Sequence, residues 1–101
     1  MSYPSSVPYE DGLRESLKDP LEAAAYLNAA LEDGSQEVFL LALRHVTEAF
    51  GMSEVARESA LNRENLYRML SAQGNPQLSS LNTLLRTIGL RLAVEIEYAN
   101  S

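Results

Sequence analysis

The chain has 101 residues, of which 46% are hydrophobic and 22% are charged, an ordinary mixture for one small globular domain. It has no cysteine and a single histidine, His45, which excludes disulfides, zinc-thiolate sites and any metal motif built on two histidines. No apolar run reaches the roughly 18 residues that a transmembrane helix needs, and the N-terminus lacks the basic and apolar regions of a signal peptide. We therefore expect a cytoplasmic protein with no membrane association.

The net charge of −6 is unevenly distributed along the chain. Residues 1–51 carry three basic and nine acidic side chains, whereas residues 52–101 carry five of each. Neutralising DNA phosphates requires Lys and Arg, so any contact with DNA is expected from the C-terminal half. The acidic half suits a basic protein partner, although the same charge can serve solubility alone.

The first third of the sequence has the residue pattern of a flexible arm followed by a helix. Residues 1–12 are rich in Pro, Gly and Ser, which predicts a flexible arm. A helix is then predicted to begin at Asp19, which can cap it, with Pro20 in the first turn, and to end at Gly34. Its predicted buried stripe consists of Leu21, Ala24, Leu27 and Leu31.

The second predicted helix begins after the cap residue Ser35, runs to about Phe50 and ends at Gly51. Its apolar positions cover a wide face at helical spacing, so we expect this helix to be central and well buried. These positions are Val38, Phe39, Leu40, Leu41, Ala42, Leu43, Val46 and Ala49, and His45 lies on the same face.

Residues 52–71 fit a helix-turn-helix. Ala56 is small enough to let the two helices meet, Ala60 and Leu61 form the turn, and Asn62 is a good N-cap for the second helix. The turn position at Ala60 often has positive φ, which costs alanine roughly 1 kcal/mol. The second helix has a predicted buried stripe of Leu66, Met69 and Leu70.

The remaining side chains of that second helix are predicted to point outward, and all of them can form hydrogen bonds. Arginine reads guanine edges, asparagine reads adenine and glutamate accepts from cytosine. A recognition helix directs its N-terminal residues at the bases of the major groove. The predicted DNA-binding residues are Asn62, Arg63, Glu64, Asn65, Tyr67 and Arg68. The alternative is a helical hairpin that packs in the same way and has no role in DNA binding.

Asn75-Pro76 interrupts the helical pattern, and a further helix is expected from about Ser79 or Ser80 to Gly89. Its apolar positions are Leu81, Leu84, Leu85 and Ile88.

Beyond Gly89 the hydrophobic period becomes two, which predicts a β-strand over residues 90–98. A lone strand lacks a partner for its backbone groups, so we expect it to pair between two copies or to join another protein's sheet. The alternative is an extended tail lying on the helices. The alternating apolar residues are Leu90, Leu92, Val94, Ile96 and Tyr98.

Four stretches carry a resemblance to a known family: DPLEAAAYLNAALEDG at 19–34, FLLALRHVTEAFGMSEVARESALNRENLYRMLS at 39–71, GNPQLSSLNTLLRTIGLRL at 74–92, and the acidic strand after it. On these residues, which cover about 14–97, the chain resembles the addiction-module antidote proteins, HigA-like antitoxins of the Xre or lambda-repressor-like helix-turn-helix superfamily. It departs from them at Asn62 and Asn65, where serine is usual, and at Ala60, often glycine.

The resemblance implies an all-α, repressor-like domain of five helices over residues 13–89, followed by the strand over residues 90–98 that pairs between protomers. It implies the antitoxin of a bacterial type II toxin–antitoxin module, which neutralises a small basic toxin of the RelE/ParE-like type. It further implies a homodimeric transcriptional repressor bound to the double-stranded DNA of its own operator.

The sequence predicts no catalytic site, no metal site and no cofactor. His45 lies on an apolar helix face and is interpreted as a core residue. Glu54 and Glu58 lie one helical turn apart beside Arg57, which is typical of a solvated face. Two alternatives stay open: a stand-alone Xre-like regulator without a toxin, and a protein-interaction module whose helix-turn-helix no longer reads DNA.

Overall fold

The two longest helices begin at the capping residues that the sequence predicts. In the computed structural model, which describes residues 12–97, helix α2 spans Pro20–Asp33 and helix α3 spans Gln36–Phe50. Asp19 accepts a hydrogen bond from the N–H of Leu21 at 3.0 Å, and Ser35 accepts one from Val38 at 3.3 Å. Gly34 ends α2 with a φ of 84°, a left-handed conformation that glycine adopts without strain.

Three shorter helices complete the predicted set. Helix α4 spans Met52–Ser59, α5 spans Arg63–Met69 and α6 spans Leu78–Thr87. Helix α6 begins slightly earlier than expected. Residues 12–16 form a further short helix, which was not among the five predicted helices. The described part of the chain is therefore all-helical, as predicted.

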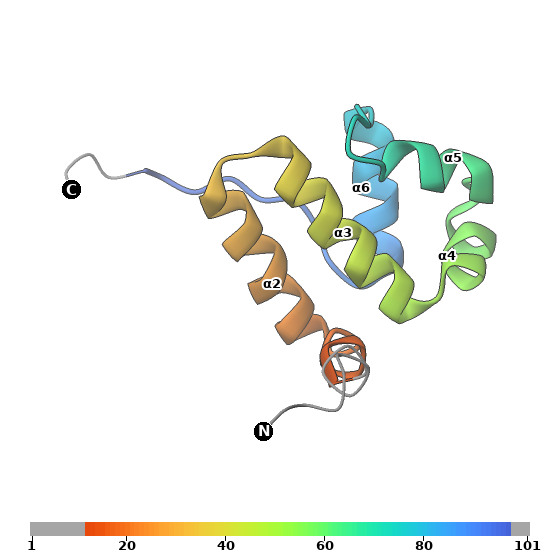
Figure 1. The fold of residues 1–101 in the computed structure, drawn as a ribbon, viewed down its shortest axis with the longest axis horizontal. Coiled ribbons are helices and arrows are strands. Elements are labelled where there is room, and N and C mark those ends of the chain that lie inside the picture. Colours follow the sequence, from red (N-terminus) through yellow and green to blue (C-terminus); the bar gives the residue numbers. More distant parts are fainter. Residues whose placement is uncertain (1–11, 98–101) are drawn as a thin grey trace, which may run out of the picture.

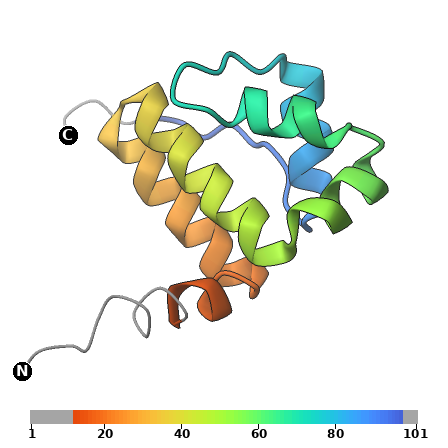
Figure 2. The same ribbon diagram turned by 45° about the vertical axis from the view of Figure 1, so that its right-hand side comes forward.

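The helices form two groups joined by α3 (Figures 1 and 2). Helices α2 and α3 pack side by side as a hairpin, and α4 contacts α3, α5 and α6. Within residues 12–97, no helix is long and apolar enough to cross a membrane.

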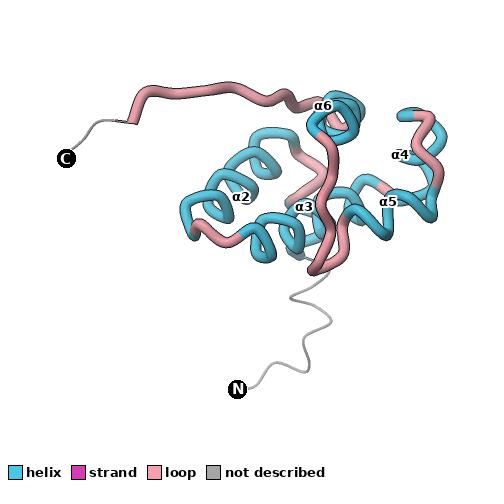
Figure 3. The backbone as a smooth tube through the Cα atoms, turned by 90° about the horizontal axis from the view of Figure 1, so that it is seen from above, coloured by secondary structure: helices cyan, strands magenta, loops and turns pink. Residues whose placement is uncertain are grey.

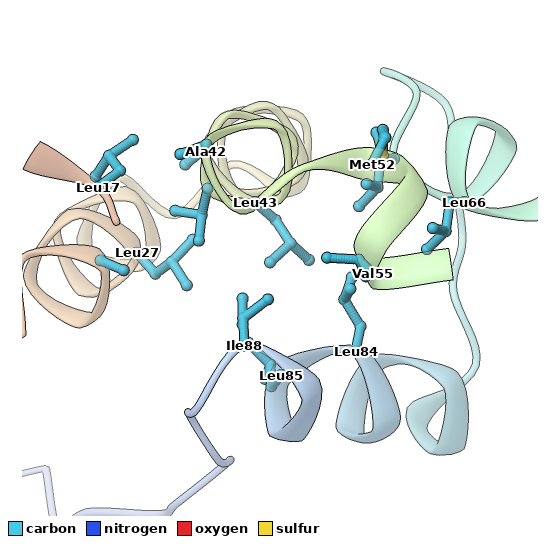
Figure 4. Packing of buried hydrophobic residues seen from close by; sticks show 14 of the residues in the cluster. Leu17, Leu27, Ala42, Leu43, Met52, Val55, Leu66, Leu84, Leu85 and Ile88 are labelled. Carbon is cyan, nitrogen blue, oxygen red and sulfur yellow. The ribbon is translucent and has the colours of Figure 1, made fainter. Parts of the chain in front are cut away.

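One apolar cluster runs through both groups. Val55 of α4, Leu43 of α3 and Leu84 of α6 are each fully buried and point toward a common centre (Figure 4). Because several helices contribute to this one cluster, the position of each depends on the others.

The buried stripe of α2 differs from the predicted one. Leu21 and Leu31 are 78% and 56% exposed, so their predicted burial is wrong. The buried residues are Ala23, Leu27 and Ala30, which share a face at i, i+4 and i+7. Small alanines let α2 approach its neighbours closely, so the alanine-rich face is buried and the flanking leucines face solvent. In α3, Val38 and Leu41 are likewise exposed.

The C-terminal segment, which we call the tail (residues 90–97), does not form a strand in this structure. No residue of the described range is in a β-strand, and residues 91–97 are all exposed. The tube in Figure 3 shows the tail running from the end of α6 past α2. A strand needs a second strand for its backbone hydrogen bonds, and residues 12–97 of a single copy offer none. Tyr98 and, except for Gly12, the predicted arm over 1–12 lie outside the described residues.

The corrected stripe of α2 leads to a stability prediction. We expect Leu27→Ala to lower the free energy of unfolding by about 2–5 kcal/mol, because it leaves a cavity in the core. The same change at the exposed Leu31 should cost less than about 1 kcal/mol. Urea unfolding of both variants measures the difference. Equal losses would contradict the assigned stripe.

Candidate nucleic-acid interface

The turn between α4 and α5 has the geometry that the sequence predicts. Ala60 has a φ of 63°, and in the described residues it is the sole non-glycine residue with positive φ. Ser59 accepts a hydrogen bond from the N–H of Leu61 at 3.2 Å, which closes the turn locally. Asn62 caps α5 by accepting a hydrogen bond from the N–H of Asn65 at 2.8 Å. The cap predicted at Asn62 is confirmed.

Helix α5 is held to the core on one face and at its C-terminal end. Leu66 is fully buried and Leu70 is 1% exposed, as predicted. After α5 the chain turns tightly at Gly74, where a Cβ atom would collide with the carbonyl group of Met69. The carbonyl oxygen of Gly74 accepts a hydrogen bond at 3.0 Å from the side chain of Gln36 on α3. This hydrogen bond joins the turn after α5 to the start of α3.

The outward face of α5 carries all the predicted site residues. Each is exposed, and five of them belong to the helix itself while one is its cap. They are Asn62, Arg63, Glu64, Asn65, Tyr67 and Arg68. The structure thus leaves the whole predicted set exposed on α5 and its cap residue.

Three of these side chains, Asn62, Asn65 and Arg68, already have hydrogen-bond partners within α5 and its cap. The side-chain oxygen of Asn62 is used for the cap, so its NH₂ group is what it offers to an external acceptor. The Nη1 atom of Arg68 donates to Oδ1 of Asn65 at 3.0 Å. Because Asn65 braces Arg68, the direction of that guanidinium group is partly set before any ligand binds.

Arg44 joins this surface from α3, and sequence reasoning missed it. Its guanidinium carbon lies 5.5 Å from the ring centroid of Tyr67, and that of Arg63 lies 6.0 Å from the same centroid. Both distances suit cation–π attraction. Arg44 also pairs with Glu48, with 3.1 Å between Nε and Oε2. Arg44 is far from α5 in the sequence, so no spacing pattern links the two. The one feature of the sequence that sets Arg44 apart is that it is the sole Lys or Arg between Lys18 and Arg57.

The charges on this surface differ in kind from those of the chain as a whole. Arg44 and Arg63 lie over Tyr67 and Arg68 lies against Asn65, whereas the chain has a net charge of −6. The nearby carboxylates are Glu48, which pairs with Arg44, and the exposed Glu64.

On α4, Arg57 and Glu54 form an exposed ion pair within the helix. The hydrogen bond from Arg57, followed by one from Glu58, holds the pKa of Glu54 below its usual value. The hydrogen bond to Glu54 raises the pKa of Arg57. Both groups are therefore charged at neutral pH, and, with Glu58 on the same helix, α4 carries two carboxyl groups and one guanidinium group.

His45 lies away from this surface, at the junction of α2 and α3. It is half-buried, and its Nδ1 atom lies 2.7 Å from the hydroxyl group of Tyr26, which is a hydrogen bond. The contact joins the two helices of the hairpin. Across residues 12–97, no three acidic or histidine side chains are close enough together to hold a metal ion.

Comparisons with known proteins place the chain among similar sequences. A family model described as "Probable addiction module antidote protein" matches residues 11–96. A protein of Haemophilus influenzae described as uncharacterized is 33% identical over 81 residues, which are 80% of this chain and 84% of that protein. No solved structure matches.

The strained turn gives a second prediction. We expect Ala60→Gly to raise the free energy of unfolding by up to about 1 kcal/mol, because glycine adopts positive φ without the Cβ clash. The matched change Ala56→Gly, inside α4, should lower it by about 1 kcal/mol. Thermal unfolding of both variants measures the two effects. A lower melting temperature for Ala60→Gly would show that the turn is not strained.

Proposed function

The chain belongs to the family of probable addiction module antidote proteins, and on this premise we propose that it is an antitoxin that also binds DNA through α5 and represses its own operon. The antidote family implies a toxin as partner. The observation that carries the DNA-binding proposal is the placement of exposed Arg63 and Arg68 on α5 with Arg44 of α3 beside them at Tyr67, within a chain that is otherwise acidic.

In this proposal α5 is the recognition helix. Arg63, in the first turn, and Arg68, braced by Asn65, supply guanidinium groups that can bind guanine edges through two hydrogen bonds. Glu64 supplies an acceptor for the amino group of cytosine. Short helices present few residues to the groove, so these side chains would carry most of the sequence preference.

Arg44 has a different role in the proposal, because it approaches Tyr67 from outside the helix-turn-helix. A guanidinium group beside the recognition helix is placed to bind a phosphate group, which positions the protein without reading the sequence. Its pairing with Glu48 keeps it oriented in the free protein. Tyr67, between the two arginines, can add a hydroxyl contact to the DNA backbone.

Repression of an operator by this domain requires two copies, because a single α5 reads only one half-site. We propose a homodimer in which the two tails pair as antiparallel strands. Centred on Val94, such pairing sets Leu92 opposite Ile96 and Arg91 opposite Glu97. Opposite charges across a strand pair are favourable, whereas parallel pairing in register would oppose glutamate to glutamate.

We further propose that the protein is a HigA-like antitoxin of the Xre superfamily. Its partner is then a small basic toxin of the RelE/ParE-like type, and it has no enzymatic activity. The net charge of −6 favours a second candidate, a protein-interaction module that does not read DNA. The two differ in one property: the module would show no salt-sensitive DNA binding.

The proposed recognition helix is tested on the promoter DNA of the protein's own operon. We expect Arg63→Ala and Arg68→Ala each to weaken specific binding by about 1–3 kcal/mol per lost base contact. Arg86→Ala, which removes an exposed arginine from α6, is the matched control and should bind as the wild type does. Fluorescence anisotropy titration measures the affinities. Unchanged affinity in both α5 variants would exclude α5 as the reading helix.

Titration of Arg44→Ala over a range of salt concentrations separates phosphate contacts from base contacts. We expect its affinity to fall by a similar factor on all DNA sequences, and the slope of log K against log salt to decrease by about 1. A changed sequence preference with an unchanged slope would mean that Arg44 reads a base.

The proposed tail pairing predicts that Val94→Pro gives a monomer, because proline removes a backbone donor from the strand. Val94 is 97% exposed, so the fold of each copy should survive. Val94→Thr keeps the donor and serves as the control. Light scattering at tens of micromolar measures the mass. A dimer of Val94→Pro would locate the interface elsewhere.

A further inference from the structure

A groove lies between α2 and the tail, on the side of the fold that carries no proposed DNA contact. Its volume is ≈ 490 Å³, and residues of α2, the start of α3, the end of α6 and the tail line it. Leu27, Phe39 and Leu85 supply apolar surface, and Leu31 and Leu92 line it while remaining 56% and 42% exposed. We call this surface the α2 groove.

The charges around the α2 groove have one dominant sign. Residues 19–43 contain no Lys, Arg or His, and their carboxylates include Glu32, which lines the groove. The tail adds Glu95 on the opposite wall, with Arg91 as the one cation of the lining. Within the described residues, the exposed carboxylates of this region make no ion pair. They are Glu22, Glu32, Asp33, Glu37, Glu95 and Glu97.

An apolar groove bordered by unpaired carboxylates is typical of a protein-binding surface. Covering exposed apolar side chains with a partner lowers the free energy, and like charges that are not paired favour a partner of opposite sign. A second copy of this chain has the same acidic α2 and would bring more negative charge to the groove. The charge therefore favours a different protein, one that is basic and has an apolar ridge.

We propose that the α2 groove is where the toxin docks, and that the toxin inserts an apolar element between α2 and the tail while its basic side chains pair with the surrounding carboxylates. This inference rests on the antitoxin function proposed above. Helix α2 and the tail lie toward one end of the molecule, and α4 and α5 lie toward the other (Figures 1 and 3). Toxin and DNA therefore bind at separate surfaces of one chain and do not compete for α5.

The test uses the full-length protein and the product of the adjacent gene of its module as the probe. We expect Leu31→Ser and Glu32→Lys each to weaken binding of that product by roughly tenfold or more. The matched controls are Leu78→Ser, which changes an exposed leucine at the start of α6, and Glu58→Lys, which makes the same charge change on α4. Both controls should bind the probe as the wild type does. Isothermal titration calorimetry measures the affinities.

A second measurement, of DNA binding by the same variants, shows whether the surfaces are separate. We expect Leu31→Ser and Glu32→Lys to keep wild-type affinity for the promoter DNA, which also shows that they fold. Wild-type affinity of these variants for the probe, or an equal loss in the controls, would overturn the proposed surface. A groove variant that becomes a monomer but keeps its affinity for the probe would also overturn the proposed surface. The groove would then be occupied by a second copy of this chain in the wild type. A wild-type protein that does not bind the probe would contradict the antitoxin function itself.

Discussion

The burial of Leu66 decides what α5 presents to its surroundings. With Leu66 fully buried and Leu70 nearly so one turn later, the opposite face of this short helix has to point outward. Helix α4 transmits this constraint, because it contacts α5 on one side and α3 and α6 on the other, with Val55 at the centre of the core (Figure 4). The outward direction of the face that carries Arg63, Tyr67 and Arg68 is therefore a consequence of core packing, and surface contacts such as that of Arg68 with Asn65 orient single groups on it.

A chain with a net charge of −6 is a poor general binder of nucleic acid, and the structure shows how such a chain can still bear a cationic surface. Arginines from α3 and α5 meet around Tyr67, while α2 and the start of α3 have carboxylates without a single cation. Segregated charge of this kind suits a protein with two partners of opposite sign. In the proposed function, the arginines bind DNA and the carboxylates bind the toxin, so each partner is directed to its own side.

The parts of this structure that depend on local chemistry could be predicted from the sequence. The caps at Asp19, Ser35 and Asn62 and the left-handed turn at Ala60 each depend on a few neighbouring residues, and all are confirmed. The stripe predicted for α2 was right at Leu27 and wrong at Leu21 and Leu31, because the small side chains of Ala23 and Ala30 let their face of the helix pack more closely. Arg44 was missed because its contact with Tyr67 exists only after α3 and α5 are packed together. The strand predicted over residues 90–98 was wrong for the residues up to 97, because the described part of one copy offers no second strand to bond with its backbone.

The central claim is that α5 of a dimer reads DNA, and selection from random duplex DNA at about 50 and 200 mM salt tests it most directly. Wild-type protein and Arg63→Ala would be selected in parallel. The account predicts a palindromic motif for the wild type, with half-sites roughly 34–36 Å apart, and loss of that motif in the variant. No enriched motif at either salt concentration would contradict the account and favour the protein-interaction module.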